Sequence, residues 1–472
     1  MELENGGLAT TLARIADRLR GHGLALIGLA TQEHLPGQPE YRVLTEMAAG
    51  FGREAAILCA TIMGTICIVH YTYGSWHVSI GPMIRRHFWI RLVESAWKER
   101  TVVWLGGVRR SGKTVLCQSL PRTRYYDCEI PSVRGALADP ERFLAGNRGK
   151  RIVLDEVHRL DNPSELLKIA ADHYGDIRIL ATGSSTLGAT RKFRDTLVGR
   201  KANVWLTPMN IPDLADFRRT DMRHRMLHGG LPPFFLGKTV PETAFQDWMD
   251  AYWAKDIEEL FRLERRASFQ KFAELLISRS GGMFEATDFA RACEINRATV
   301  LNYLSVLDQT FVVHVLKPFS SRRAVEIVSA PRIYAFDTGF VCYYHGLRGI
   351  GRSEMGLLWE HVILNELHSG LQTRRIGYWR DKKGHEVDFI LPVRGGKPIA
   401  IECKLKAKGA DISGLLEFGK IYPGAGLILA AADAKETAII KVGSQSIVVT
   451  GPATLVPHIR RTAHNLLKSQ YS

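Results

Sequence analysis

The sequence GVRRSGKT at residues 107–114 fits the pattern G-x-x-x-x-G-K-[ST], with an apolar run before it and a helical pattern after it. Gly107 and Gly112 allow a tight loop whose backbone N–H groups can surround phosphate oxygens. Lys113 would reach the β- and γ-phosphates, and the Thr114 hydroxyl would coordinate Mg²⁺. We therefore expect ATP and Mg²⁺ to bind here. The alternative, a glycine-rich turn with a chance lysine, is disfavoured by the flanking strand and helix.

A second apolar run, RIVLDE at residues 151–156, ends in two acids. A buried strand that ends in two carboxylates is costly unless they have a function. Asp155 would hold Mg²⁺ through its water shell, and Glu156 would polarise the attacking water. Such a pair is expected of a hydrolysing ATPase. The alternative is a surface pair that caps the next segment.

Two further residues are candidates for contact with the nucleotide. Ser184 follows the next apolar run and would lie beside the γ-phosphate, although a serine that caps a helix has the same sequence pattern. Arg200 would act as an arginine finger, or it is a solvated surface arginine. A finger supplied in trans requires a homo-oligomer, which we therefore include among the expected partners.

A third group of polar residues lies near the C-terminal end of the chain. Asp388 lies in the strand pattern EVDFIL, and Glu402-Cys-Lys404 ends the next one. Alternate side chains of a strand share a face, so Glu402 and Lys404 would point together toward Asp388. Asp388 and Glu402 would bind Mg²⁺ or Mn²⁺ and activate water, and Lys404 would position that water or stabilise the phosphorane.

This acid, hairpin and E-x-K arrangement resembles the PD-(D/E)xK nucleases. Such folds often supply another metal ligand from the preceding helix, and the resemblance implies Glu360 for that role. The alternative is a nuclease-like fold kept as a DNA-binding or assembly module, in which the acids and the lysine form a solvated or ion-paired face.

Residues 286–318 have the pattern helix, tight turn, helix and strand, which is typical of a winged helix-turn-helix. The side chains expected to face DNA are Arg297, Thr299, Asn302, Arg322 and Arg323. The alternative is a winged helix that only packs against its neighbours.

The elements that must position these groups indicate a multidomain α/β protein. Between about residues 101 and 210, short apolar runs alternate with helical stretches, which is typical of a parallel sheet covered on both faces. The predicted segments are an atypical extension (1–82), a P-loop ATPase domain (83–220), a helical linker with the winged helix (221–345) and a small α/β nuclease-like domain (346–472).

Composition limits the function classes. With 472 residues, 46% hydrophobic and 24% charged, the chain has the composition of a soluble globular protein, which excludes a disordered, collagenous or coiled-coil chain. The net charge of +15 favours an acidic partner, DNA before an anionic membrane. Seven cysteines without C-x-x-C spacing indicate a reducing, cytoplasmic setting, and the sixteen histidines show no zinc-enzyme motif.

The first 82 residues differ from the rest, because they contain no lysine and carry a net charge of −2, which leaves +17 for the remainder. Their apolar segment 55–69 is shorter than the roughly 20 residues needed to span a bilayer. It is predicted to be a buried helix or strand, with membrane contact as the weaker alternative, so no stable membrane association is expected. One hypothesis is that translation naturally begins at Met83; the other is an extension of unknown role.

Ten motifs occur in one order across about residues 83–405: GGVRRSGKT, IVLDEVHRL, ATGSS, LVGR…LTPMNIPDL, LHGGLPPF, YWAKDIEEL, RIYAFDTGF, GLLWEHVILNEL, YWRDKKGHEVDFIL and AIECK. Together they resemble the bacterial and archaeal ATPases that pair an AAA-type P-loop domain (the AAA-14 group) with a C-terminal DUF4143 region. The resemblance implies an ATPase core, a winged helix and a nuclease-like fold, but no particular reaction.

The predicted function is an ATPase whose nucleotide cycle acts on a DNA-directed C-terminal region, with a metal-dependent nuclease as its possible activity. The alternative is a nucleotide-switched DNA-binding or scaffolding regulator that does not cleave strands.

Overall fold

The structure is a computed structural model that describes residues 59–62, 65–72, 75–183, 196–239, 242–258, 266–320 and 330–468. The chain divides into two compact units, one of residues 1–85 with 118–121 and one of residues 86–117 with 122–472. In the first unit, β1 (Cys59–Ile62), β2 (Thr65–Thr72) and β3 (Ser75–Pro82) form an antiparallel sheet. The described residues of the apolar segment therefore form strands rather than a helix. No helix in the described ranges is long and apolar enough to cross a membrane.

The second unit begins with a five-stranded sheet in the order β5-β6-β7-β4-β8. Its strands are β4 (Val102–Gly106), β5 (Thr123–Asp127), β6 (Arg151–Asp155), β7 (Arg178–Thr182) and β8 (Lys201–Trp205). All neighbouring pairs are parallel. All five residues of β4 are buried, as expected for a strand covered on both faces. The predicted parallel α/β sheet is confirmed.

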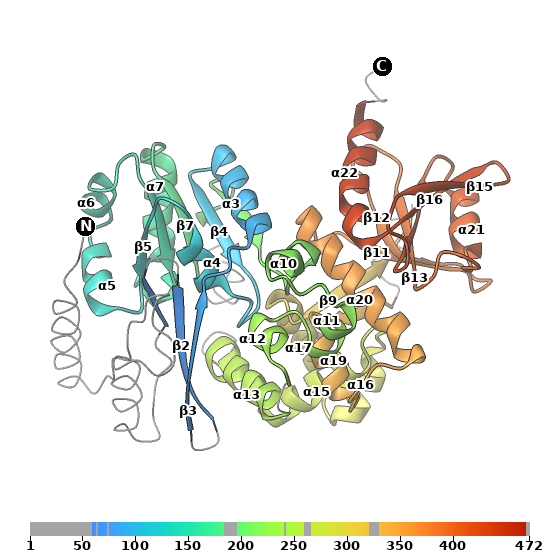
Figure 1. Ribbon diagram of the computed structural model, residues 1–472, viewed down its shortest axis with the longest axis horizontal. Helices are drawn as coiled ribbons and strands as arrows, with labels where there is room; N and C mark the ends of the chain where they lie inside the picture. Colours follow the sequence, from blue (N-terminus) through green and yellow to red (C-terminus); the bar gives the residue numbers. More distant parts are fainter. Residues whose placement is uncertain are drawn as a thin grey trace. The chain divides into compact units, whose positions relative to one another are not determined.

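Helices flank this parallel sheet (Figure 1). They are α3 (His87–Glu99), α4 (Lys113–Ser119), α5 (Pro131–Leu137), α6 (Pro140–Ala145) and α7 (Pro163–His173), with a short 3₁₀ turn at Val157–Arg159. In α3, Trp89, Val93 and Trp97 recur every four residues and so form one buried face. The Trp97 indole N–H donates to the Ile179 carbonyl at 3.0 Å, which ties α3 to β7.

A mainly helical region follows the parallel sheet. Its helices are α10 (Ile211–Asp216), α11 (Met222–His228), α12 (Pro232–Leu236), α13 (Glu242–Tyr252), the π-helical η2 (Trp253–Ile257), α15 (Arg266–Ser278), α16 (Ala286–Cys293), α17 (Arg297–Gln309) and α19 (Thr338–Tyr344). Aromatic rings dominate its core: Trp248 stacks on Tyr252 and on Phe336.

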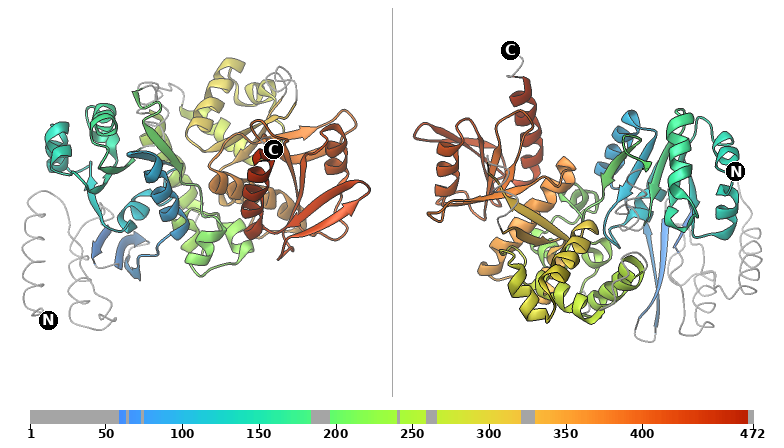
Figure 2. Two further views of the ribbon diagram at one scale, coloured as in Figure 1. Left: turned by 90° about the horizontal axis from the view of Figure 1, so that it is seen from above. Right: turned by 180° about the vertical axis from the view of Figure 1, so that it is seen from behind.

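The remaining strands form one eight-stranded sheet in the order β10-β9-β11-β12-β13-β14-β16-β15. They are β9 (Val313–Pro318), β10 (Arg332–Ala335), β11 (Gly377–Arg380), β12 (Glu386–Leu391), β13 (Ile399–Lys404), β14 (Gly426–Ala431), β15 (Ala438–Val442) and β16 (Gln445–Thr450). Helices α20 (Arg352–Leu371), α21 (Ser413–Ile421) and α22 (Pro452–Lys468) pack against it. Figure 2 shows the C-terminal strands of this sheet, β11 to β16, in orange and red from two further sides.

This sheet runs across the predicted domain boundary between residues 345 and 346. Gly377 in β11 pairs in parallel with Lys317 in β9. The two strands approach so closely that a Cβ atom at Gly377 would lie 2.7 Å from the Lys317 carbonyl oxygen. The hairpin that follows α17 and the C-terminal strands therefore share one hydrogen-bonded sheet.

Candidate nucleotide and nuclease-like sites

The phosphate-binding motif forms the loop between β4 and α4, at the carboxyl edge of the parallel sheet. Gly107 has φ +150° and Gly112 has φ +92°, a region of backbone conformation that favours glycine. A Cβ atom at Gly107 would lie 2.4 Å from the Leu206 carbonyl oxygen. The loop therefore requires glycine at both predicted positions, for conformation at each and for space at Gly107.

Lys113 folds back over this loop. Its Nζ donates to the carbonyl oxygens of Gly107 at 3.0 Å and Val108 at 3.2 Å. Burial lowers the pKa of Lys113, and the Glu156 carboxylate partly opposes that shift. The buried Ser111 hydroxyl has no hydrogen-bond partner among the described residues, and Thr114 is exposed to solvent. A cation held by neutral carbonyls beside a buried, unpaired hydroxyl fits a loop that accepts an anionic phosphate chain.

Asp155 ends β6, and β7 lies between it and the strand of the loop. The Tyr125 hydroxyl donates to one carboxylate oxygen of Asp155 at 2.7 Å, and the Thr182 hydroxyl donates to the other. The predicted contact Ser184 follows Thr182 by two positions and lies outside the described residues. Thr182 and Tyr125 are therefore polar partners of the site that the motif alone does not reveal.

Glu156 adopts a left-handed backbone conformation, with φ +55°, where β6 turns into the 3₁₀ helix. Its carboxylate pairs with the His158 ring at 3.1 Å. Burial raises the pKa of Glu156, but the hydrogen bond from His158 and the charge of Lys113 outweigh it, so the pKa lies below its ordinary value. Glu156 is thus an ionised carboxylate close to the loop, which a group that polarises water requires.

Arg200 lies at the opposite edge of the parallel sheet. Lys201, which follows it, pairs with Val102 at the start of β4, whereas the loop begins after Gly106. Four residues of strand separate these edges by about 13 Å. The Arg200 guanidinium pairs instead with Asp172 at 2.7 Å. Arg200 therefore does not reach the loop of its own chain, and the arginine-finger prediction could apply only to a nucleotide bound by another copy.

The helical region also contacts the loop. Arg109 pairs with the buried Asp256 of η2 at 3.1 Å, and the Trp248 indole N–H donates to the Arg109 carbonyl at 3.1 Å. These contacts join residues about 140 positions apart, so no local sequence pattern could have indicated them. The loop is therefore in direct contact with α13 and η2.

The structure brings the acids and the lysine of the nuclease-like motif together on β12 and β13. The Cys403 backbone N–H donates to Asp388 at 2.8 Å, which fixes Asp388 beside the E-x-K strand. Lys404 donates to one oxygen of Glu402 at 2.6 Å. Glu360 reaches the same cluster from α20 and accepts a hydrogen bond from Tyr334 at 2.8 Å.

The three acids of this cluster repel one another in a buried setting. Burial, followed by the charge of Asp388, raises the pKa of Glu360 to about 7 and that of Glu402 to about 8. Burial likewise raises the pKa of Asp388. One carboxylate oxygen of Glu402 is buried and finds no hydrogen-bond partner in the part of the chain that the structure describes. By the chemistry of its oxygens, though not by their arrangement, this donor set suits a divalent cation, which would relieve both the repulsion and the unpaired oxygen.

The side chains of this cluster are nevertheless not arranged as a complete metal-binding site. Across the described ranges, no three His, Cys, Asp or Glu side chains are arranged so that they could hold a metal ion. Glu360 is engaged with Tyr334, so the predicted third ligand would have to exchange that hydroxyl for the ion. Asp388, Glu402 and Glu360 therefore remain predicted ligands.

Arg332 is a member of this cluster that the sequence did not indicate as a site residue. It comes from β10, pairs with Glu386 and places one guanidinium nitrogen 3.9 Å from Asp388. It belongs to the string RIYAFDTGF, which was singled out only as a family motif. Arg332 thus supplies a second positive charge beside Lys404.

The side chains predicted to face DNA are only partly described. On α17, Arg297 and Asn302 are exposed and Thr299 is half-buried, while Arg322 and Arg323 lie outside the described residues. Asn296 caps this helix by accepting a hydrogen bond from the Thr299 N–H at 2.7 Å. Two of the expected contacts are therefore accessible.

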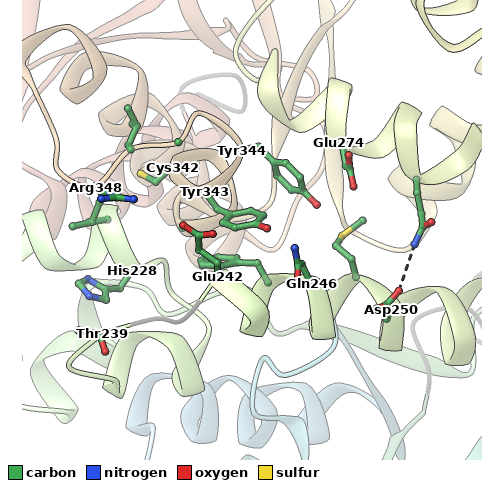
Figure 3. Close-up of a pocket in the computed structure, with 17 residues that line it drawn as sticks. His228, Thr239, Glu242, Gln246, Asp250, Glu274, Cys342, Tyr343, Tyr344 and Arg348 are labelled. Atoms are coloured by element: carbon green, nitrogen blue, oxygen red, sulfur yellow. Dashed lines mark hydrogen bonds between the residues drawn. The ribbon is translucent and has the colours of Figure 1, made fainter. Parts of the chain in front are cut away.

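A cavity of about 1030 Å³ opens in the helical region between α11, α13, α15 and α19 (Figure 3). Glu242, Gln246 and Glu274 line it together with Tyr343 and Tyr344. The described residues that were predicted for a site do not line this cavity.

The parallel sheet, its glycine loop and the acids beside that loop define a P-loop NTPase domain. In agreement, residues 99–215 match the family model of the AAA domain of the AAA_14 group, and residues 355–445 match the domain of unknown function DUF4143. The chain thus carries an AAA-type ATPase domain, which binds ATP, and a DUF4143 region, which confirms the resemblance seen in the motifs. Residues 219–350 match a further domain of unknown function, DUF8612, which the motifs did not indicate.

Relatives cover about two thirds of the chain. The uncharacterized protein Rv2008c of Mycobacterium tuberculosis is 28% identical over 318 residues, which are 64% of this chain and 70% of the relative. The uncharacterized protein MJ1544 of Methanocaldococcus jannaschii is 20% identical over 347 residues, which are 66% and 75% of the two chains. Among solved structures, a Walker-type ATPase of Pyrococcus abyssi aligns with a TM-score of 0.37 and 15% identity, covering 56% of this chain and 96% of its own.

Proposed function

We propose that this chain hydrolyses Mg²⁺-bound ATP at the 107–114 loop and that the nucleotide cycle acts on a C-terminal region directed to DNA. The observation that carries the hydrolysis is Glu156, an ionised carboxylate that directly follows Asp155 and acts electrostatically on Lys113. A binding loop alone requires no such group, whereas hydrolysis requires one to orient the attacking water.

The residues of the loop and the two acids at the end of β6 have separate roles in binding and in the reaction. When ATP binds, Lys113 exchanges the carbonyl oxygens of Gly107 and Val108 for phosphate oxygens. This favours binding because the ammonium group forms stronger hydrogen bonds with anionic acceptors than with neutral ones. Thr114 and Asp155 would hold Mg²⁺, which neutralises charge that develops on the phosphates. Glu156 leaves His158 and accepts a hydrogen bond from the attacking water.

The second activity that an observation favours is metal-dependent cleavage of a phosphodiester. Its support is the unpaired, buried oxygen of Glu402 among acids with raised pKa values. Asp388 and Glu402 would hold Mg²⁺ or Mn²⁺, which supplies an activated water, and Lys404 would stabilise the developing negative charge. The alternative is a regulator without strand cleavage, in which the Lys404–Glu402 and Arg332–Glu386 pairs keep the acids neutralised.

DNA is the partner that the charge supports. The segment from residue 83 onward carries +17, and counterion release makes such a surface favour a polyanion. If residues 286–318 act as a winged helix, Arg297 and Asn302 are the accessible side chains on its second helix. A reducing, cytoplasmic setting agrees with five of the seven cysteines, which are free and buried: Cys117, Cys128, Cys293, Cys342 and Cys403.

Paired assays on the full chain test the two activities separately. Phosphate release from ATP is measured for wild type, Lys113→Ala and the matched control Lys98→Ala, an exposed lysine on α3. Nicking of plasmid and branched DNA in Mg²⁺ and in Mn²⁺ is measured for wild type, Asp388→Asn and the control Asp161→Asn, an exposed aspartate.

We expect Lys113→Ala to abolish ATP turnover and Asp388→Asn to abolish nicking without affecting turnover. Turnover that persists in Lys113→Ala would contradict the assignment of the loop. Nicking by neither wild type nor variants, with turnover intact, would leave the ATP-switched regulator as the function.

A further inference from the structure

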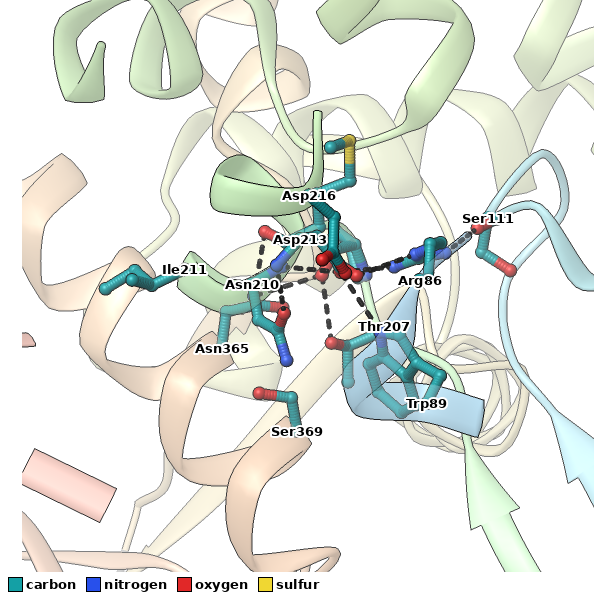
Figure 4. A network of polar contacts seen from close by, with 12 residues as sticks. Arg86, Trp89, Ser111, Thr207, Asn210, Ile211, Asp213, Asp216, Asn365 and Ser369 are labelled. Atoms are coloured by element: carbon teal, nitrogen blue, oxygen red, sulfur yellow. Dashed lines mark hydrogen bonds and ion pairs between the residues drawn. The ribbon is translucent and has the colours of Figure 1, made fainter. Parts of the chain in front are cut away.

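Arg86 is a buried arginine that lies outside the phosphate-binding motif and yet contacts its loop (Figure 4). It is only 3% exposed and comes directly before α3. One of its terminal nitrogens donates to the carbonyl oxygen of Ser111 at 2.8 Å. Burying a guanidinium carries a free-energy penalty of desolvation, so we expect its hydrogen bonds to have a structural or functional role.

The other two guanidinium nitrogens are held by Asp213, which is fully buried in α10. They lie 2.9 and 2.5 Å from the two carboxylate oxygens, a paired geometry that fixes the plane of the guanidinium. Asp213 also accepts hydrogen bonds from the Trp89 indole at 3.0 Å and from the Asn210 backbone N–H at 3.1 Å. Arg86 is therefore oriented rigidly toward the loop.

The contact with Ser111 determines the direction of a loop N–H group. A trans peptide is planar, so the Ser111 carbonyl and the Gly112 N–H point in opposite directions. Because the Ser111 carbonyl is turned toward Arg86, the N–H of Gly112 is directed away from Arg86, and backbone donors of this kind surround phosphate oxygens in such loops. A cationic donor on the carbonyl also strengthens the N–H of the same peptide as a donor.

We propose that Arg86 is a positioning residue that orients the Ser111–Gly112 peptide for phosphate binding. This inference rests on ATP binding at the 107–114 loop. Because Asp213 neutralises its charge, Arg86 acts through geometry rather than as another cation for the phosphates.

Helix α10, which carries Asp213, also connects the loop to the C-terminal region. At the start of α10, the Ile211 N–H donates to Glu366 of α20 at 2.9 Å. Nearby, the Asn365 side chain donates to the Pro208 carbonyl at 3.1 Å. The element that holds Arg86 is thus docked on α20, the helix that also carries Glu360.

The test compares Arg86→Lys with Arg85→Lys, a change at the neighbouring exposed arginine, and with Trp97→Phe, a change at another buried tryptophan of α3. A lysine keeps a charge for Asp213 but cannot bridge Asp213 and the Ser111 carbonyl in one plane. Trp97→Phe removes the indole donor to the Ile179 carbonyl and leaves the contacts of Arg86 with Asp213 and Ser111 in place. For each full-length protein, the Kd for a fluorescent ATP analogue and the Tm without nucleotide are measured.

We expect Arg86→Lys to raise the Kd for the analogue by roughly ten- to a hundredfold, the loss typical of a charge-assisted hydrogen bond. Arg85→Lys should have the wild-type Kd. Trp97→Phe should lower the Tm and keep the wild-type Kd. The proposal is overturned if Arg86→Lys binds like wild type, or if Trp97→Phe loses as much affinity.

If Arg86→Lys does not fold, the pair Arg86→Met/Asp213→Asn replaces it, because it leaves no unpaired buried charge. This variant should fold and bind the analogue at least roughly tenfold more weakly, and unchanged binding would overturn the proposal. If wild type itself binds no analogue, the proposed function fails together with the inference. If wild type binds the analogue and the Arg86 variants bind it with the same Kd, the inference about Arg86 is refuted while the proposed function stands.

Discussion

Asp155 owes its position to two hydroxyl groups that the phosphate-binding motif does not include. Tyr125 and Thr182 each donate to one of its carboxylate oxygens, so the carboxylate is held in one orientation before any ion binds. Partners of this kind usually affect reaction more than binding, because they orient a ligand without touching the substrate.

The first prediction concerns Thr182. Thr182→Val keeps the volume of the side chain and removes the hydroxyl that donates to Asp155. ATP turnover should fall roughly tenfold or more, while the Kd for ATP without Mg²⁺ stays near the wild-type value. The control is Thr101→Val, at the opposite edge of the same sheet. Equal turnover in both variants would show that Thr182 does not position Asp155.

The second prediction is a pH dependence that originates at Glu366. Burial raises the pKa of this carboxyl from its ordinary 4.5 to about 8. Because the folded-state pKa is raised, its contribution to stability is full below pH 4.5 and is lost as the pH rises through about 8. Glu366→Gln resembles the protonated form and keeps an acceptor for the Ile211 N–H.

Thermal unfolding of both proteins at about pH 5 and about pH 8.5 measures this effect. The variant should gain stability relative to wild type at the higher pH, on the order of a few kcal/mol. The same loss of Tm in both proteins between the two pH values would mean that Glu366 is not the group responsible.

At the level of elements, the sequence predicted what local pattern determines. The apolar runs near residues 101–107 and 151–156 became β4 and β6 because strands covered on both faces need continuous hydrophobicity. The glycines of the loop were also predictable from a local pattern, because the spacing of the motif places glycine where the backbone adopts positive φ angles. The acids and lysine of β12 and β13 could be placed together because alternate strand positions share a face.

Contacts between distant segments were not predictable. The Arg86–Asp213 pair spans 127 positions, and either residue alone looks like a surface charge. The pairing of Gly377 with Lys317 likewise joins segments that local patterns assign to different domains. Arg200 was singled out by residue type alone, and only the strand register shows that it lies at the wrong edge for its own loop.

The third prediction tests the joint between β9 and β11. A methyl group at Gly377 would lie 2.7 Å from the Lys317 carbonyl oxygen, so Gly377→Ala should separate the two strands. We expect a loss of stability of roughly 1–3 kcal/mol. In Gly349→Ala the added atom meets nothing within 4 Å, and its Tm should match wild type. Equal Tm values for the two variants would show that the close approach carries no cost.

At the scale of the second compact unit, a continuous set of contacts runs from the nucleotide loop to the nuclease-like cluster. Arg86 connects the loop to α10, and α10 docks on α20 through Glu366. Glu360 lies on the same helix and faces the acids of β12 and β13. These contacts therefore join the nucleotide loop to the helix that carries Glu360.

The central claim is that ATP is hydrolysed at the 107–114 loop with Glu156 orienting the attacking water. The measurement that tests it most directly is single-turnover phosphate release by wild type and Glu156→Gln, each with its Kd for ATP. The account predicts that the variant binds ATP like wild type and releases phosphate at least roughly a hundredfold more slowly. Release at the wild-type rate from Glu156→Gln would contradict it.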